Sequence, residues 1–425
     1  MGTLRWILMF FILLAGNIGF CLDADLISRL DYACRENLDV RYPAMIDTEH
    51  GGFIENYDSK WQPLKEQKKF IVSQARSLWL ASEAFSMYPE KKEYRTAAEA
   101  GFRFLKDHMW DQEYGGFYWQ LSREGKIMPA PEDGKHVYGI SFGIYGCAAY
   151  SRIFSDKESL ELARRTFEWL DTNAHDGKNG GYFEVLDRKG VPVLDNDKNA
   201  GQNMIDGFIG YKTMNAHIHL MESFTELYRI WPDRKLESRL RELFSIIKKN
   251  IVSPTGGMHL FFTPDWKPLP GHDSYGHDVE TAYLLLETAE VLGMKDEPET
   301  LKLAKKMVDN AIDFAWDAEK GGLAEEGEAY RKARDSKKVW WTQAEFLNAL
   351  LLMDKKFPDD PRGYYALFKK QWQYIDDYLI DHHYKGWYQY GLDSGGKIDD
   401  PKSSAWFCGY HNGRALMNCI RMMRE

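Results

Sequence analysis

Apolar residues recur at intervals of three and four residues in twelve stretches of the chain. This spacing places the apolar side chains on one face of a helix, so each stretch predicts an amphipathic α-helix. The predicted helices cover residues 24–40, 69–87, 92–108, 137–154, 157–173, 205–230, 234–251, 277–292, 299–315, 337–355, 362–379 and 404–422. We therefore expect a core that is helical throughout.

Glycine pairs divide these helices into an internal repeat. Pairs followed by an apolar or aromatic residue begin at Gly51, Gly115, Gly180, Gly256 and Gly321, and the segment 386–388 is a degenerate sixth copy. Successive copies start about 65 residues from one another, except for a longer third interval. A segment of this length can hold two ordinary helices and their connection. Each repeat therefore predicts one helical pair, and six repeats give twelve helices.

Six helical pairs can form an open stack or a closed ring. An open stack needs polar capping repeats at its ends, whereas a ring buries both ends. The first and last pairs here are no more polar than the middle ones. The pattern predicts an all-α fold, an (α/α)6 barrel of six helical hairpins.

Two further features concern the edges of this barrel. Short alternating segments such as 115–120 are typical of strands and predict small β-hairpins at one rim. The longer third interval predicts a surface loop around Val185 to Asn203, rich in Asp, Lys and Gly, which could also cover a pocket.

The first 21 residues have the layout of a secretory signal. One basic residue, Arg5, precedes an apolar run over 6–15 that is too short to span a bilayer, and small residues lead up to Cys21. We expect residues 1–21 to be removed, 22–425 to form the barrel domain, and the product to be exported to the periplasm or secreted. A lipid anchor on Cys21 is the alternative.

Composition restricts the class of partner. With 44% apolar and 28% charged residues the 425-residue chain can bury a large core, and its net charge of −9 gives no basic surface for nucleic acid. We expect a monomer that binds a small, neutral or polar molecule. Once the signal is removed, we expect no association with a membrane. The remaining cysteines show no CxxC spacing and are expected to be buried as small hydrophobic residues; they are Cys34, Cys147, Cys408 and Cys419.

Polar and aromatic residues gather at equivalent points of the six repeats. If the helix after each glycine pair is the inner one, residues near its start line the central cavity. The candidates are Arg76, Tyr138, Asn215, His219, His277, Glu280, Trp340, Trp341, Glu345, Trp406 and His411. Any one of them could simply pack in a core, but their recurrence predicts one site at the mouth of the ring. Four neighbours keep a structural interpretation, namely His136, His217, Glu222 and Asp278.

This set of side chains favours chemistry on a sugar. Aromatic faces stack on sugar rings while amides and charges bind hydroxyl groups. Histidine titrates near neutral pH, so two histidines on opposite sides of a carbon can exchange the roles of base and acid. In an opened aldose the aldehyde acidifies the C2 proton, and a cation such as Arg76 can stabilise the enediolate. Reprotonation from the other face would invert C2.

Other interpretations stay open at this point. Glu280 and Glu345 could serve as the carboxylate pair of a glycoside hydrolase or lyase on the same barrel. A sugar-binding protein without catalysis would keep the tryptophans but has no use for opposed histidines. No phosphate-binding glycine loop or nicotinamide motif is present, and the histidines lack the local spacing of metal motifs, so neither a cofactor nor a metal is expected.

Five motifs resemble the N-acylglucosamine 2-epimerase family, in particular its cellobiose 2-epimerase branch, over essentially the whole mature chain. They are QARSLW at 74–79, MNAHIH at 214–219, GHDVE at 276–280, WWTQAE at 340–345 and YHNGRA at 410–415. The resemblance implies an (α/α)6 barrel that epimerises C2 of the reducing-end sugar of β-1,4-linked disaccharides, either cellobiose or mannobiose, and leaves the glycosidic bond intact. An N-acylglucosamine or monosaccharide 2-epimerase, or an aldose–ketose isomerase, is the alternative.

The same resemblance implies roles for the candidates. It makes His277 and His411 the paired general acid and base, with Glu280 orienting His277. It implies that His219 assists at the ring oxygen or O1 of the sugar. The remaining candidates would bind substrate, with Arg76 and Asn215 on the C1–C2 oxygens and Trp341 (or Trp340) and Trp406 stacked on sugar rings. Phe407 and Gly409 stand where a lysine and a proline are expected, which leaves the shape of that loop and the preferred disaccharide open.

Overall fold

The computed structural model describes residues 24–129, 134–194, 212–328, 333 and 336–425. The predicted signal peptide lies outside these residues, as do positions 195–203 of the predicted surface loop. The remaining part of that loop is partly ordered as strand, because Val185–Leu186 form β4.

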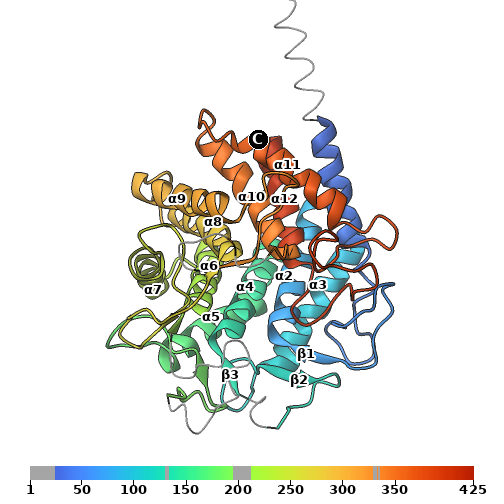
Figure 1. Ribbon diagram of the computed structural model, residues 1–425. Coiled ribbons are helices and arrows are strands. Elements are labelled where there is room, and N and C mark those ends of the chain that lie inside the picture. The colour runs from blue at the N-terminus through green and yellow to red at the C-terminus, as the bar shows by residue number, and fades with distance from the viewer. Residues whose placement is uncertain (1–23, 130–133, 195–211, 329–332, 334–335) are drawn as a thin grey trace, which may run out of the picture.

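Six helices form a closed inner ring (Figure 1). They are α2 (Ile71–Met87), α4 (Val137–Phe154), α6 (Met214–Ile230), α8 (Tyr275–Val291), α10 (Trp340–Lys356) and α12 (Tyr410–Arg424). Each packs against the next, and α12 packs against both α10 and α2, which closes the ring. These are the helices that follow the glycine pairs, so both the (α/α)6 barrel and the assignment of the inner helices are confirmed.

The other helices form an outer layer. They are the helix over 24–39, α3 (Lys92–Phe104), α5 (Lys157–Asn173), α7 (Arg234–Ile246), α9 (Pro298–Ala315) and α11 (Tyr364–Tyr378). The outer helices bury a single face, as α3 does with Tyr94, Ala97, Gly101 and Phe102, whereas inner α4 is buried without a break from Val137 to Ser151. Single π-helical turns extend α3 and α7, namely η1 (Leu105–Met109) and η2 (Ile247–Ile251).

Two inner helices begin well after the positions that their apolar spacing predicted, at 214 rather than 205 and at 410 rather than 404. Helix α6 begins at Met214, because the preceding residue Thr213 is paired in a strand and its hydroxyl accepts a hydrogen bond from Ala216 N, as a helix N-cap does. Helix α12 begins at Tyr410, after a segment of bends. The predicted helical positions 205–211 lie outside the described residues.

Short strands gather at one rim of the ring, where the inner helices begin. They are β1 (Lys68–Phe70), β2 (Gln120–Ser122), β3 (Lys135–His136), β4 (Val185–Leu186), β5 (Lys212–Thr213), β6 (Phe261–Phe262), β7 (Asp273–Ser274) and β8 (Glu326–Gly327). They pair as β1–β2, β3–β4, β5–β6 and β7–β8, all antiparallel.

These pairs differ in part from the predicted hairpins. The two strands of a pair come from consecutive repeats, with helices between them in sequence, so each pair ties one repeat to the next. Local hairpins are also present, since Leu121 bridges to Ile127 and Leu186 bridges to Pro192.

An ion pair with a buried lysine recurs at this rim and was not anticipated from the sequence. In five repeats an aspartate before the glycine turn binds a lysine in the segment that leads into the inner helix. The pairs are Asp47–Lys69 (2.9 Å), Asp111–Lys135 (2.9 Å), Asp176–Lys212 (2.7 Å), Asp317–Lys338 (2.9 Å) and Asp381–Lys402 (2.7 Å). In the fourth repeat Ser253 and Asp273 take these positions.

Three lysines of this set, Lys69, Lys212 and Lys338, also bind a carbonyl of the glycine turn, which explains the turns. Lys69 Nζ donates to the carbonyl of Gly51 at 2.8 Å, and Gly51 and Gly52 have left-handed φ values of +79° and +65°. In the degenerate sixth copy, Lys385 adopts a φ of +68° in place of the first glycine. The turn and the start of the inner helix are thereby held together.

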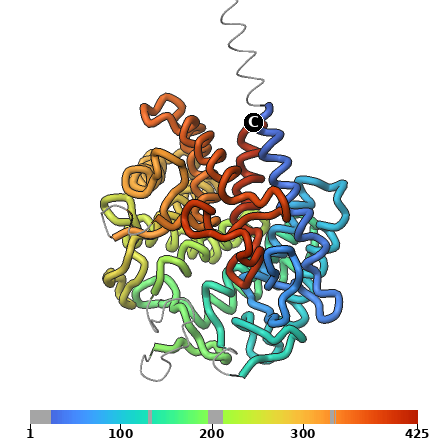
Figure 2. The backbone as a smooth tube through the Cα atoms, turned by 45° about the vertical axis from the view of Figure 1, so that its right-hand side comes forward, coloured from blue at the N-terminus to red at the C-terminus, as the bar shows by residue number. Residues whose placement is uncertain are grey.

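The first and last described segments lie side by side (Figure 2). Arg424 near the end of α12 binds Asp31 of the first helix at 3.1 Å. Cysteines 34, 147, 408 and 419 are unpaired and buried, as predicted. Among the described residues, no helix combines the length and the apolar character that a bilayer span requires.

The rim ion pairs predict a large difference between a buried and an exposed lysine. Lys212 is fully buried, and Lys212→Met should lower the free energy of unfolding by about 3 kcal/mol, because Asp176 would keep its charge in a buried place without its cation. Denaturant unfolding of the purified variant measures this.

The matched control lies in the next loop. Lys267 binds Asp265 at 2.9 Å, but both side chains are largely exposed, so Lys267→Met should leave the unfolding midpoint unchanged. Equal losses in the two variants would contradict the structural role given to the buried pairs.

Candidate active site

The candidate side chains meet where the inner helices begin, at the rim that carries the strands. Most are removed from solvent: Arg76, Tyr138, His219, Glu280, Glu345 and His411 are each at most 5% exposed. His277, Trp341 and Asn215 are half-buried. The ring thus brings together side chains from all six repeats.

An arginine that the sequence did not single out lies at the centre of this group. Arg414 on α12 is buried, and its Nη2 donates to Glu280 Oε1 at 2.5 Å and to Glu345 Oε1 at 2.6 Å. Its Nη1 binds Glu222, a residue that had been given only a structural interpretation. A buried charge needs partners of opposite sign. An arginine three residues after His411, in a helix that was expected to be buried, was therefore the signal in the sequence for a central ion pair.

His411 is oriented by the same carboxylates. Its Nδ1 lies 2.7 Å from Glu345 Oε1 and 3.8 Å from Glu280 Oε1. Burial, reinforced by the positive charge of Arg76, holds the pKa of His411 well below its usual range. The imidazole of His411 is therefore neutral at neutral pH and can accept a proton.

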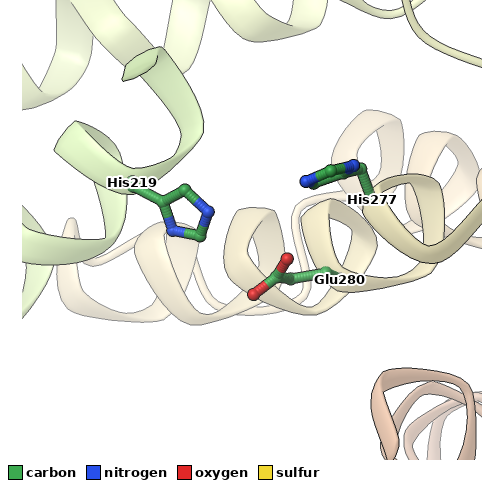
Figure 3. Close-up of side chains that lie close together, drawn as sticks. All are labelled: His219, His277 and Glu280. Carbon is green, nitrogen blue, oxygen red and sulfur yellow. The ribbon is translucent and has the colours of Figure 1, made fainter. Parts of the chain in front are cut away.

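His219 and His277 face each other beside Glu280 (Figure 3). One nitrogen of each ring and one carboxylate oxygen of Glu280 lie within 4.8 Å of one another. His219 Nδ1 binds Glu222 Oε2 at 2.8 Å. Burial lowers the pKa of His219 to about 3 and that of His277 to about 4.

The group that fixes the ring of His277 differs from the one the resemblance implied. Nδ1 of His277 is 2.6 Å from the hydroxyl of Ser274, whereas Glu280 lies on the side of the ring that faces His219 (Figure 3). Ser274 is three residues before His277, in the strand that precedes α8, so strand β7 positions this histidine.

Trp341, rather than Trp340, faces the histidines. Its ring centroid is 4.7 Å from that of His277 and 5.6 Å from that of His411. A side chain at Gly276 would place its Cβ 2.4 Å from the Trp341 ring, which explains the glycine before His277. Trp340 is buried against Phe407, at 4.5 Å between ring centroids.

Arg76 supplies a positive charge beside the histidines. Its Nη2 donates to the hydroxyl of Tyr138 at 3.2 Å, and its guanidinium carbon is 4.2 Å from the centroid of Phe142. Nε of Arg76 and Oδ1 of Asn215 are buried, and neither has a hydrogen-bond partner in the part of the chain that the structure describes. Both atoms can therefore bind substrate hydroxyl groups.

Trp406 lies farther out, with 41% of its surface exposed. It packs on Phe70 at 4.8 Å, Trp119 at 6.4 Å and Tyr138 at 6.3 Å between ring centroids. Trp119 was not predicted as a site residue, although it lies in the alternating segment 115–120. Together these rings form an aromatic surface beside the buried polar groups.

The two departures from the expected motif have structural explanations. Phe407 is fully buried against Trp340. A Cβ on Gly409 would lie 2.5 Å from Nε of Arg41, so this arginine requires glycine there. The loop before α12 is thus held by packing on Trp340 and Arg41.

The structural interpretation is confirmed for two of the set-aside residues. His217 is fully buried: its Nδ1 donates to Thr213 O at 2.7 Å and its Nε2 accepts from Tyr182 N at 3.0 Å. Asp278 is buried beside Asn310, and burial raises its pKa well above the usual range. His136 packs on Trp119 and lies 3.5 Å from Glu184.

Two overlapping groups of side chains have the donor types and the spacing to hold a metal ion. They are His219, His277 and Glu280, and Glu280, Glu345 and His411. However, Glu280 and Glu345 already bind Arg414, and Arg76 adds a second positive charge. This charge arrangement opposes a divalent cation at either group.

Comparison with known proteins agrees with the geometry. The sequence profile of N-acylglucosamine 2-epimerase (GlcNAc 2-epimerase) matches residues 52–412. The chain belongs to the N-acylglucosamine 2-epimerase family. All the candidate side chains fall within the span that this family shares, and Arg414 lies two residues after its end.

Members of this family align along nearly their whole length. A cellobiose 2-epimerase of Bacteroides fragilis is 32% identical over 90% of this chain and 94% of its own. One of Ruminococcus albus is 33% identical over 88% and 93%. The solved cellobiose 2-epimerase of Spirochaeta thermophila superposes with a TM-score of 0.84 at 28% identity, covering 95% of this chain and 98% of that one.

The bonds of His217 predict a pH effect on stability. Burial lowers its pKa to about 3, and an imidazolium could no longer accept from Tyr182 N. Below pH 6.5 the unfolded chain binds a proton at this position and the folded chain does not, so the free energy of unfolding falls as pH is lowered. Between pH 7 and pH 5 this single group should contribute a loss of about 2 kcal/mol.

Comparison with His217→Gln isolates this contribution. Glutamine does not titrate, so the stability advantage of the wild type over the variant should shrink by that amount between the two pH values. Urea unfolding at pH 7 and pH 5 measures it, and an advantage that stays constant would contradict the assignment of a neutral, doubly bonded His217.

Proposed function

We propose that this protein inverts C2 of the reducing-end sugar of β-1,4-linked disaccharides, converting cellobiose to glucosyl-mannose or mannobiose to mannosyl-glucose. The observation that carries the proposal is that His277 and His411 both contact Trp341 and both lie beside Glu280. Two histidines are thereby presented to one small space. Relatives named cellobiose 2-epimerase support the same reaction.

The reaction begins with the opened sugar. His219, fixed by Glu222, is suited to move a proton between the ring oxygen and O1. One of the paired histidines then removes the C2 proton, and the C–H electrons form the C1–C2 double bond of an enediolate. Arg76 stabilises the negative charge that develops on the oxygens.

The second histidine completes the inversion. Because both imidazoles are neutral in the unliganded protein, this histidine takes up a proton from water once the negative charge of the enediolate lies beside it, and delivers that proton to the opposite face of C2. No electrons enter or leave, and no cofactor is needed. Glu345 on Nδ1 of His411 is placed to stabilise an imidazolium at that position. Exchange of the histidine protons with water restores the starting state.

The positions of the carboxylates favour this reaction over glycoside hydrolysis. A hydrolase needs two carboxyl groups that flank a bond, one of them free to give a proton. Here Glu280 and Glu345 both bind the same nitrogen of Arg414, and Glu345 also binds His411. They serve as supports for the histidines.

The aromatic surfaces favour a disaccharide over a single sugar. Trp341 lies at the histidines, whereas Trp406, with Trp119 and Phe70, lies farther out. Two separate platforms match two linked sugar rings. We also propose that the enzyme is exported, on the basis of the signal-like layout of residues 1–21.

Incubation in D2O tests the reaction directly. Cellobiose and mannobiose should each be followed by NMR, and the expected result is the C2 epimer with deuterium at C2. Released monosaccharides without deuterium would instead indicate a hydrolase, and turnover of mannose or N-acylglucosamine alone would indicate the monosaccharide alternative.

Substitutions test the roles of the histidines. His277→Asn and His411→Asn should each lower kcat at least 100-fold, since each removes one partner of the proton transfer. The exposed His383 gives the matched control, and His383→Asn should keep full activity. Loss of activity in Glu280→Gln alone, with both histidine variants active, would contradict the mechanism.

Sequencing the N-terminus of the protein recovered from its native cells tests export. The expected mature chain begins near residue 22 and is found outside the cytoplasm. A cytoplasmic protein that keeps residues 1–21 would overturn this part of the proposal, and a lipid-modified Cys21 would establish the anchored alternative.

A further inference from the structure

A second cavity opens at the opposite end of the ring from the strands and the candidate active site. Its volume is about 370 Å³, and it is lined chiefly by α8, α10 and α12 near their C-terminal ends. Figure 1 shows this end of the molecule beside the C-terminus, away from β1, β2 and β3. Nothing in the proposed reaction uses this cavity.

Unsatisfied polar atoms line this cavity. Asn348 is fully buried, and neither its Nδ2 nor its Oδ1 has a hydrogen-bond partner among the described residues. Asn418 also lines the cavity, where its amide interacts with the hydroxyl of Tyr283. A buried amide without partners is costly, so a molecule in the cavity must offer both donors and acceptors.

The rest of the lining restricts the chemistry of that molecule. Tyr283, Leu286 and Leu352 provide aromatic and apolar surface. The five basic and four acidic side chains of the lining nearly cancel, and several are already paired, such as Arg229 with Glu287 at 2.8 Å. The cavity therefore has little net charge to attract an ion, and amides beside an aromatic ring suit hydroxyl groups and C–H surfaces.

The inner wall of the cavity adjoins the back of the candidate active site. Tyr283 follows Glu280 by three residues on α8, and its ring centroid is 5.7 Å from the guanidinium carbon of Arg414. Asn348 follows Glu345 by three residues on α10. A ligand there would contact the helices that hold the central charges, one turn below them.

We propose that this cavity is a second binding site, for an uncharged sugar or polyol, separate from the site that carries the histidines. The inference rests on the cavity, the unpartnered amide of Asn348 and the balanced charge of the lining. It holds whether or not the proposed epimerisation is correct.

Selective ¹⁵N labelling of asparagine side chains tests the proposal with D-glucose as the probe. The amide signal of Asn348, assigned through its loss in Asn348→Gln, should shift in a saturable way as glucose is added. The amide signal of Asn215 reports the candidate active site in the same spectra, so binding at the two places is read independently.

A variant that fills the cavity provides the decisive comparison. Leu352→Trp should weaken glucose binding at least tenfold, measured at the amide signal of Asn348 or at that of Asn418. Leu303→Trp replaces an equally half-buried leucine on α9, outside the cavity, and should leave binding unchanged. Circular dichroism and an unshifted Asn215 signal confirm that both variants are folded.

Two results would overturn the proposal. If glucose and glycerol leave the Asn348 and Asn418 signals in place up to high concentration, the cavity holds water only. If inorganic phosphate shifts them and glucose does not, the cavity binds anions and the proposed class of ligand is wrong.

Discussion

The structure depends on one buried cation. Arg414 is almost completely removed from water, and such a charge is tolerated only with partners of opposite sign. It binds Glu222, Glu280 and Glu345, which come from three other inner helices. The same carboxylates bind His219 and His411. The group that ties four helices together at the centre of the ring is therefore also the group that orients two of the three histidines.

A second set of charges fixes the position along the barrel axis at which these side chains meet. The aspartate–lysine pairs join five of the six glycine turns to the segment that leads into an inner helix. Because the candidate side chains, apart from Trp406, lie in the first two turns of those helices, a shift of one helix along its axis would separate them. The fourth repeat lacks the pair, and there Ser274 in β7 holds His277 directly.

Burial has opposite effects on the two kinds of charged group. Carboxylates and arginines at the centre stabilise one another by pairing, whereas the histidines lose their charge, and the pKa of His277 falls to about 4. The result is a set of neutral bases beside fixed charges of both signs. This is the environment in which a carbon acid can lose a proton to histidine and in which Arg76 can hold the resulting anion.

The sequence by itself determined the twelve helices, the sixfold repeat, the closed ring and the places where unusual side chains collect, because helical period and repeat spacing are properties of the chain alone. It also placed residues such as His219, His277 and His411 at the starts of inner helices. Which groups then pair could not be read from it. The partners of Arg414, the choice of Ser274 rather than Glu280 for His277, and the choice of Trp341 over Trp340 depend on distances across the ring. Those distances join residues far apart in the chain, so only the tertiary structure decided them.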